Sequence, residues 1–159
     1  MTNPSQSYET SMLITDALLG EHGAFHLFLG HIERSLPSFD SVSVLQNQIA
    51  AFTFALENHA ALEDKLFFTA LEPHLGTRNG PLAQMRLEHA QITDLLGRFE
   101  STASLDDGRS LFGQMIQVTR GHFQKEEQVL FHMARQFLNE DELSSLGAKW
   151  KEHRIPLLR

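Results

Sequence analysis

Four long segments of this chain carry apolar residues at alternating steps of three and four, which is the repeat of an amphipathic helix. The segments cover about residues 8–36, 41–72, 81–99 and 107–138, and residues that favour turns separate them. No stretch shows the apolar and polar alternation of a half-buried strand. Because short connections make consecutive helices antiparallel, the sequence predicts an all-α, up-down-up-down four-helix bundle.

A short fifth helix is expected to follow the bundle. Asn139 and Glu142 are spaced as a capping box, in which each side chain bonds the backbone N–H of the other residue. At 159 residues and 42% hydrophobic, the chain is long enough for one core and too short for two. We therefore expect one domain over residues 1–159, with the bundle over about 8–138 and the C-terminal helix over about 139–152.

Charge and composition exclude several classes of function. A formal net charge of -7 disfavours binding to nucleic-acid phosphates, and no apolar stretch reaches the roughly 18 residues of a membrane span. The chain has no cysteine, so thiolate metal sites, iron–sulfur clusters and disulfides are excluded. We expect a cytoplasmic protein without nucleic-acid or membrane partners, in which histidine and carboxylate hold any metal.

Polar residues interrupt each apolar stripe near its middle. Burying carboxylates and imidazoles in an apolar bundle is costly unless something compensates their charge. Counted from the connecting loops at about 1.5 Å per helical residue, these side chains lie within one or two turns of a common level. The sequence predicts that one metal-binding layer is formed by His22, His59, Glu63, His89, His122 and Glu126.

The second half of the chain repeats the pattern of the first. Residues 59–68 and 122–131 align as His-x-x-x-Glu-acid-x-x-hydrophobic-Phe, and each half has a Glu-His pair upstream. Spacing by four places the histidine and the glutamate on one face of a helix. The repeat predicts an approximate twofold axis through a site whose donors suit iron or manganese, with each carboxylate able to bridge two ions.

With His22, His59-x-x-x-Glu63, His89 and His122-x-x-x-Glu126, the chain resembles the hemerythrin-like, HHE cation-binding family over about residues 8–138. The resemblance implies a carboxylate-bridged, non-haem di-iron centre with two ions per chain. Such centres react with dioxygen, nitric oxide or peroxide, or sense iron and oxygen. Manganese or zinc are expected as alternative occupants in a crystal.

The third helix departs from the family pattern. Oxygen-carrying members have a second histidine four residues after the one that matches His89, and this chain has Thr93 there. The internal repeat pairs Thr93 with His26, which is either a further ligand or a hydrogen-bond donor beside one. As a ligand, His26 would give one iron three imidazoles and leave the other iron, near His89, with two.

The remaining acidic and histidine residues near the layer are expected outside it. Asp64 and Glu127 lie about 140° around the helix from their histidines, which favours solvent, although an extra residue per turn would make Glu127 the ligand. For Glu21 and Glu88 we favour exposure to solvent over a role in which they accept hydrogen bonds from the metal-binding histidines. Surface positions are expected for His31, His74 and His153, and a structural one at the edge of the stripe for His132.

Three classes of function fit these residues. The leading one is a protein that binds or senses dioxygen or nitric oxide at a di-iron centre. The alternative is a di-iron oxidoreductase acting on peroxide or ferrous iron, in which open metal positions are catalytic. The third is an interaction module whose polar core is only structural.

Overall fold

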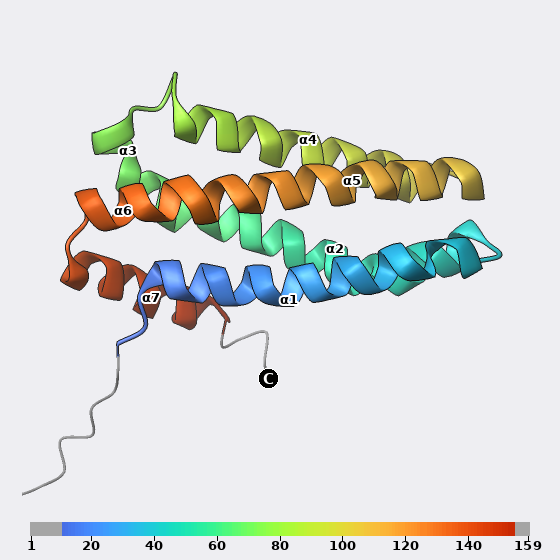
Figure 1. Cartoon of the computed structure of the whole chain (residues 1–159), viewed down its shortest axis with the longest axis horizontal. Helices are drawn as coiled ribbons and strands as arrows, with labels where there is room; N and C mark the ends of the chain where they lie inside the picture. The colour runs from blue at the N-terminus through green and yellow to red at the C-terminus, as the bar shows by residue number, and fades with distance from the viewer. Residues whose placement is uncertain (1–10, 155–159) are drawn as a thin grey trace, which may run out of the picture.

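The computed structural model describes residues 11–154, and all regular structure in that range is helical (Figure 1). The predicted beginning of the first helix near residue 8 lies outside the described residues. The elements in chain order are α1 (Ile14–Ser35), η1 (Leu36–Ser38), α2 (Val42–Glu63), η2 (Asp64–Phe68), α3 (Thr69–Leu75), α4 (Pro81–Ser101), α5 (Leu105–Lys125), η3 (Glu126–Leu130), α6 (Phe131–Phe137) and α7 (Glu140–Arg154).

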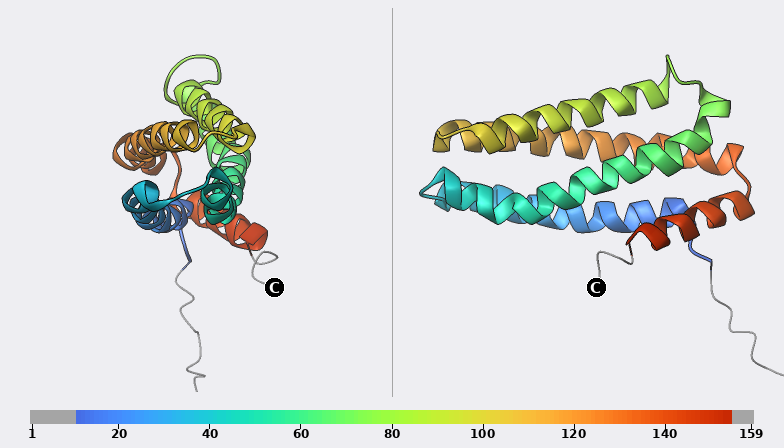
Figure 2. Two further views of the ribbon diagram at one scale, coloured as in Figure 1. Left: turned by 90° about the vertical axis from the view of Figure 1, so that its right-hand side faces the viewer. Right: turned by 180° about the vertical axis from the view of Figure 1, so that it is seen from behind.

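These elements form four antiparallel rods and one shorter helix (Figure 2). The rods are α1, the continuous run α2–η2–α3, α4, and the run α5–η3–α6. The helix α7 turns back from the end of α6 and packs along the first turns of α1. The predicted all-α, up-down-up-down bundle with a C-terminal helix is therefore confirmed.

Local residue chemistry explains where the helices begin. The Ser41 hydroxyl accepts a hydrogen bond from the N–H of Val44 at 3.3 Å, and Pro81 opens α4 where its missing N–H costs nothing. The predicted capping box is confirmed, because the N–H of Asn139 donates to Glu142 at 2.8 Å and the N–H of Glu142 donates back at 2.9 Å.

The second helix extends past its predicted end near residue 72. Pro73 lies inside α3, where its missing N–H removes one intrahelical hydrogen bond, and the helix nevertheless continues to Leu75. The chain then turns at Gly76, whose φ of 74° lies in the region that only glycine adopts readily. The break before the third helix is accordingly shorter than the sequence suggested.

Two π turns, η2 and η3, interrupt the long rods at positions of the internal repeat that differ by one residue. In η3 the N–H of Phe131 bonds the carbonyl of Glu126, five residues back, and in η2 the Thr69 hydroxyl donates to the Asp64 carbonyl at 3.0 Å. A π turn adds one residue to the helical repeat. Every apolar position after it is therefore shifted by one.

This shift corrects the predicted apolar stripe beyond each π turn. Continuing the steps of three and four from His122 and Glu126 places Val129 and Phe137 inside, but they are 49% and 41% exposed. Leu66, the counterpart of Val129 in the first half, is only partly buried, and so is Ala70, the next position of the same stripe. The residues that fill the core in their place are Phe67, Phe68, Leu71, Leu130, Phe131 and Ala134.

The core consists of two apolar clusters separated by the polar residues of the stripes. One cluster, around Leu29, Leu45 and Phe112, fills the bundle toward the α1–α2 and α4–α5 connections. The other, around Phe67 and Trp150, fills the opposite half under α7. Among the described helices, none combines the length and apolar character needed to cross a bilayer.

The π turn predicts different responses to two single-residue deletions. Deleting exposed Gln128 inside η3 should restore regular helix without rotating the residues on either side, so the bundle should still melt cooperatively. Deleting exposed Gln117 in the regular part of α5 should rotate everything after it by about 100° and abolish cooperative melting followed by circular dichroism. Equal damage from both deletions would contradict this account of η3.

Candidate metal centre

Six side chains from four rods converge between the two apolar clusters, and all six are buried. The Glu63 carboxylate lies 3.6 Å from Nε2 of His59 and 3.5 Å from Nε2 of His89. The Glu126 carboxylate lies 3.3 Å from Nε2 of His122 and 3.4 Å from that of His22. The structure thus brings together all six residues that the sequence placed in one layer.

The six residues divide into two overlapping groups, each with two imidazoles and two carboxylates. Within a group, one potential ligand atom from each residue lies within 4.8 Å of all the others. Glu63 and Glu126 belong to both groups. The groups are His22, His59, Glu63 and Glu126, and Glu63, His89, His122 and Glu126.

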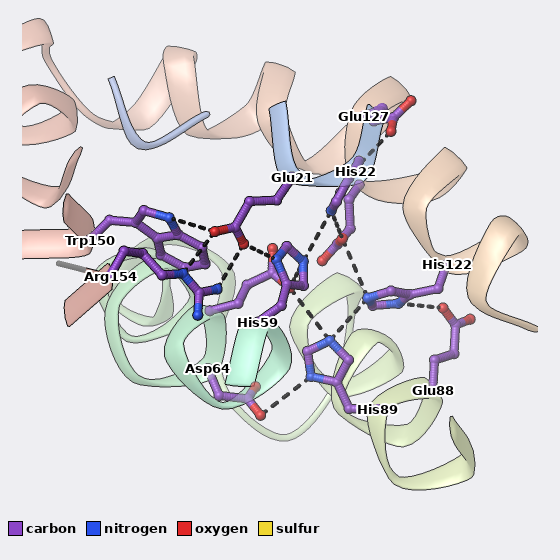
Figure 3. A network of polar contacts seen from close by, with 12 residues as sticks. Glu21, His22, His59, Asp64, Glu88, His89, His122, Glu127, Trp150 and Arg154 are labelled. Atoms are coloured by element: carbon purple, nitrogen blue, oxygen red, sulfur yellow. Dashed lines mark hydrogen bonds and ion pairs between the residues drawn. The ribbon is translucent and has the colours of Figure 1, made fainter. Parts of the chain in front are cut away.

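Each imidazole has a second carboxylate behind it, on its Nδ1 side (Figure 3). Glu21 and Glu88, each preceding a histidine of the layer, reach across to the histidine of the neighbouring helix. Asp64 and Glu127 do the same from the π turns. The pairs are His22 with Glu127 at 3.0 Å, His59 with Glu21 at 2.7 Å, His89 with Asp64 at 3.3 Å, and His122 with Glu88 at 3.1 Å.

We call Glu21, Asp64, Glu88 and Glu127 the outer carboxylates. These pairs correct the expectation that the outer carboxylates face solvent. That expectation considered the angle between each carboxylate and the histidine of its own helix, whereas the contacts run between helices. Glu126, not Glu127, points to the layer, and the π turn that begins there directs Glu127 to His22. The signal available in the sequence was the acidic residue beside a layer residue at all four places in the repeat.

The outer carboxylates determine which nitrogen of each ring carries the proton. Burial alone would raise the pKa of Glu88, but hydrogen bonds from His122, Lys125 and Gln84 lower it to about 2. Burial also opposes ionisation of Glu21, yet hydrogen bonds with His59 and Arg154 lower its pKa below the usual value. An ionised carboxylate only accepts, so Nδ1 donates and Nε2 of a neutral ring presents its lone pair to the layer.

The inward donor atoms fit a bound cation. Nε2 of His22 lies 3.2 Å from Nε2 of His59, and the corresponding atoms of His89 and His122 are 3.0 Å apart. Lone pairs this close repel unless a proton or a metal ion lies among them. Both carboxylate oxygens of Glu63 and of Glu126 are buried without a hydrogen-bond partner. Imidazole and carboxylate donors in this number suit iron, manganese or zinc.

Without a cation, protons must neutralise part of the layer. Burial and the charge of Glu63 raise the pKa of Glu126 well above its usual value. Burial lowers the pKa of His22 to about 2, so this ring stays neutral. Burial disfavours charge on His89 too, but the hydrogen bond to Asp64 and the nearby charge of Glu63 outweigh it and raise the pKa to about 9. Metal binding to such a layer therefore releases protons.

The structure does not bring His26 to the layer. Its side chain is 40% exposed and lies outside both groups, with Nε2 3.7 Å from the Glu127 carboxylate. The sequence left two roles open for His26, a further ligand or a hydrogen-bond donor beside one. Its position beside Glu127 corresponds to the second role. Each group therefore has two imidazoles, in place of the three and two expected with His26 as a ligand. As expected, His31, His74 and His153 are exposed, and so is His132.

Thr93 lies beside a small cavity next to the layer. The cavity has a volume of about 20 Å³ and extends between α2, α4 and α5. Three histidines of the layer form one wall, and apolar side chains form most of the remainder. Its lining residues are Leu56, Glu57, His59, Ala60, His89, Ile92, Thr93, Leu96, His122 and Phe123.

Comparison with known proteins gives one match. A family model described as the Hemerythrin HHE cation binding domain matches residues 13–134. The matched range contains all six residues of the layer and ends before α7. No curated protein and no solved structure matches the chain.

Because protons and metal ions compete for the layer, its metal affinity should rise with pH. His89 holds its proton up to about pH 9, and a divalent ion must displace it. Between pH 6 and pH 8 the Kd for Zn²⁺ should fall by at least about tenfold per pH unit, because at least one proton is released for each binding event. Competition with a chromophoric chelator, corrected for the chelator's own titration, measures this dependence. A Kd that stays constant over the range would contradict it.

Proposed function

Because the chain belongs to the hemerythrin HHE cation-binding family, we propose that the layer holds two iron ions bridged by Glu63 and Glu126 and takes up dioxygen or nitric oxide. His22 and His59 would complete one position, and His89 and His122 the other. Two adjacent iron ions would supply a redox-active site for a small ligand. The observation that carries the proposal is the small, mostly apolar cavity against three of these four histidines.

The size of the cavity limits what can reach the layer from this side. About 20 Å³ suffices for one water-sized molecule, far below the roughly 300 Å³ of a typical organic-ligand pocket. Leu56, Ile92, Leu96 and Phe123 offer no hydrogen bonds. This lining favours a small neutral diatomic molecule over an ion or an organic substrate.

The protein's own part in this function is to hold four rings in a fixed orientation. The outer carboxylates keep each Nδ1 occupied, so the rings cannot rotate their Nε2 atoms away from the ligand position. Phe123 stacks on His22 with ring centroids 3.9 Å apart, and Phe68 stacks on His89 at 5.5 Å. These rings exclude water from the layer and keep the site rigid.

A second candidate function is the decomposition of peroxide at the same centre, which disproportionates peroxide to water and dioxygen and needs no further reductant. Two polar residues, Glu57 and Thr93, also line the cavity. Peroxide has O–H donors and acceptors that an apolar wall cannot satisfy, so hydrogen-bonding groups at the entrance favour it. Dependence of the activity on the Thr93 hydroxyl would distinguish this function from uptake of a diatomic molecule.

Metal analysis after anaerobic loading with ferrous iron should give two iron atoms per chain. Replacing both Glu63 and Glu126 by alanine should remove both atoms, because the two groups share these bridging carboxylates. Glu100→Ala, which alters an exposed carboxylate in α4, is the matched control and should keep two. A ratio near one in the wild type, or no loss in the double variant, would rule out the bridged pair.

Substitutions at Thr93 should separate the two candidate functions. Thr93→His places an imidazole in the cavity and should slow, at least several-fold, both nitric oxide uptake and air oxidation of the ferrous protein. Thr93→Val keeps the shape but removes the hydroxyl, so nitric oxide uptake should be unchanged. Stopped-flow absorbance measures these rates. Unchanged rates in Thr93→His would contradict the role of the cavity, and loss of fast peroxide consumption in Thr93→Val would favour the second function.

A further inference from the structure

The helix α7 reaches the centre through one of the outer carboxylates. Arg154 donates from Nε and Nη2 to the two oxygens of Glu21, both at 2.7 Å, and the indole N–H of Trp150 donates to Glu21 at 3.3 Å. Glu21 in turn accepts from Nδ1 of His59 at 2.7 Å. Figure 3 shows Glu21 between His59 on one side and the two α7 side chains on the other.

The contact of α7 with the site is aromatic as well as polar. The buried ring of Trp150 meets the ring of His59 edge to face, with centroids 5.7 Å apart. The Arg154 guanidinium lies 4.7 Å from the Trp150 centroid, over its ring. Trp150 therefore covers His59 while Arg154 holds both Trp150 and Glu21.

A close backbone approach sets the position of α7. A Cβ added at Gly147 would lie 1.9 Å from the carbonyl oxygen of Met12, a distance that no side chain tolerates. Gly147 faces the start of α1, and the neighbouring buried residues Leu143 and Trp150 pack into the apolar cluster there. The docking of α7 thus depends on a glycine at this point.

Among residues 11–154, no helix takes the place of α7 in the other half of the repeat. Glu88, the counterpart of Glu21, receives hydrogen bonds from Gln84 at 2.8 Å and from Lys125, both within the bundle. A lysine ammonium is a point charge on a flexible stem, whereas the arginine fork fixes both carboxylate oxygens in one plane. The two metal positions have equal sets of protein donors but unequal support behind them.

We propose that Trp150 and Arg154 are positioning residues that fix Glu21 against His59 and make the position of His22 and His59 the tighter of the two. The proposal rests on the metal ligands proposed above. Loss of a group that orients a metal ligand typically weakens binding by about 10- to 100-fold. The position of His89 and His122, supported by Lys125 and next to the cavity, is then the one that exchanges its ion more readily.

Titration with Co²⁺ tests the proposal, because Trp150 is the only tryptophan in the chain and a paramagnetic ion near His59 quenches its fluorescence. The wild type should bind two Co²⁺ ions in two steps, with most quenching in the tighter step. Arg154→Met should weaken that step by about tenfold and leave the other unchanged. Arg154→Lys should restore part of the loss, and Lys125→Met should weaken only the other step.

Two controls separate positioning from general stability. Arg120→Met removes an ion pair with Glu33, at 2.8 Å between α5 and α1, and should bind Co²⁺ as the wild type does. Gly147→Ala should displace α7 and reproduce the Arg154→Met result, whereas Gly113→Ala, with open space around the added Cβ, should not. Gly147→Ala keeps the test available if Arg154→Met does not fold.

Two results would overturn the inference. If Arg154→Met and Gly147→Ala show the two wild-type affinities, or lose both steps equally, the inference alone is wrong. If the wild type binds no Co²⁺, the ligand assignment fails, and the inference falls with it.

Discussion

The rest of this structure depends on one interaction, the hydrogen bond from an imidazole Nδ1 to a carboxylate on another helix. It occurs four times, and each time it turns Nε2 inward. The consequence is a buried layer in which four nitrogen donors face the partnerless carboxylates of Glu63 and Glu126. Apolar clusters on both sides keep water away, so only protons or cations can neutralise it.

The two π turns give this layer its symmetry. Each begins at or directly after one of the two glutamates that both groups share, so adjacent residues of one helix serve two different tasks. Glu63 and Glu126 point inward, while Asp64 and Glu127 reach histidines on neighbouring helices. In a regular α-helix adjacent residues point about 100° apart. The π turn adds one residue at this point, so that one carboxylate points to the layer and the next to a neighbouring helix, while the apolar residues after the turn still face the core. The symmetry does not extend beyond the layer, because α7 supports Glu21 but not Glu88, and the cavity is lined by three of the four histidines.

The sequence predicted those features that a pattern within a single helix reveals. Apolar periodicity identified the bundle and the interruption of the stripes by His22 or His89, and the spacing of Asn139 and Glu142 identified the α7 cap. It failed beyond each π turn, since a one-residue shift is invisible to a fixed period. The contacts that the outer carboxylates make with other helices were also missed. Glu21 is 133 residues from Arg154, and no local pattern relates them.

X-ray absorption at the iron K-edge of the anaerobically loaded protein tests the central claim most directly. The account predicts a metal–metal scattering path at about 3.5 to 4 Å, the usual spacing of two-metal sites. It also predicts about two imidazoles for each iron, as the two groups of the layer provide. A spectrum with imidazole scattering but without a metal–metal path would show isolated ions, and would contradict a layer in which Glu63 and Glu126 join two positions.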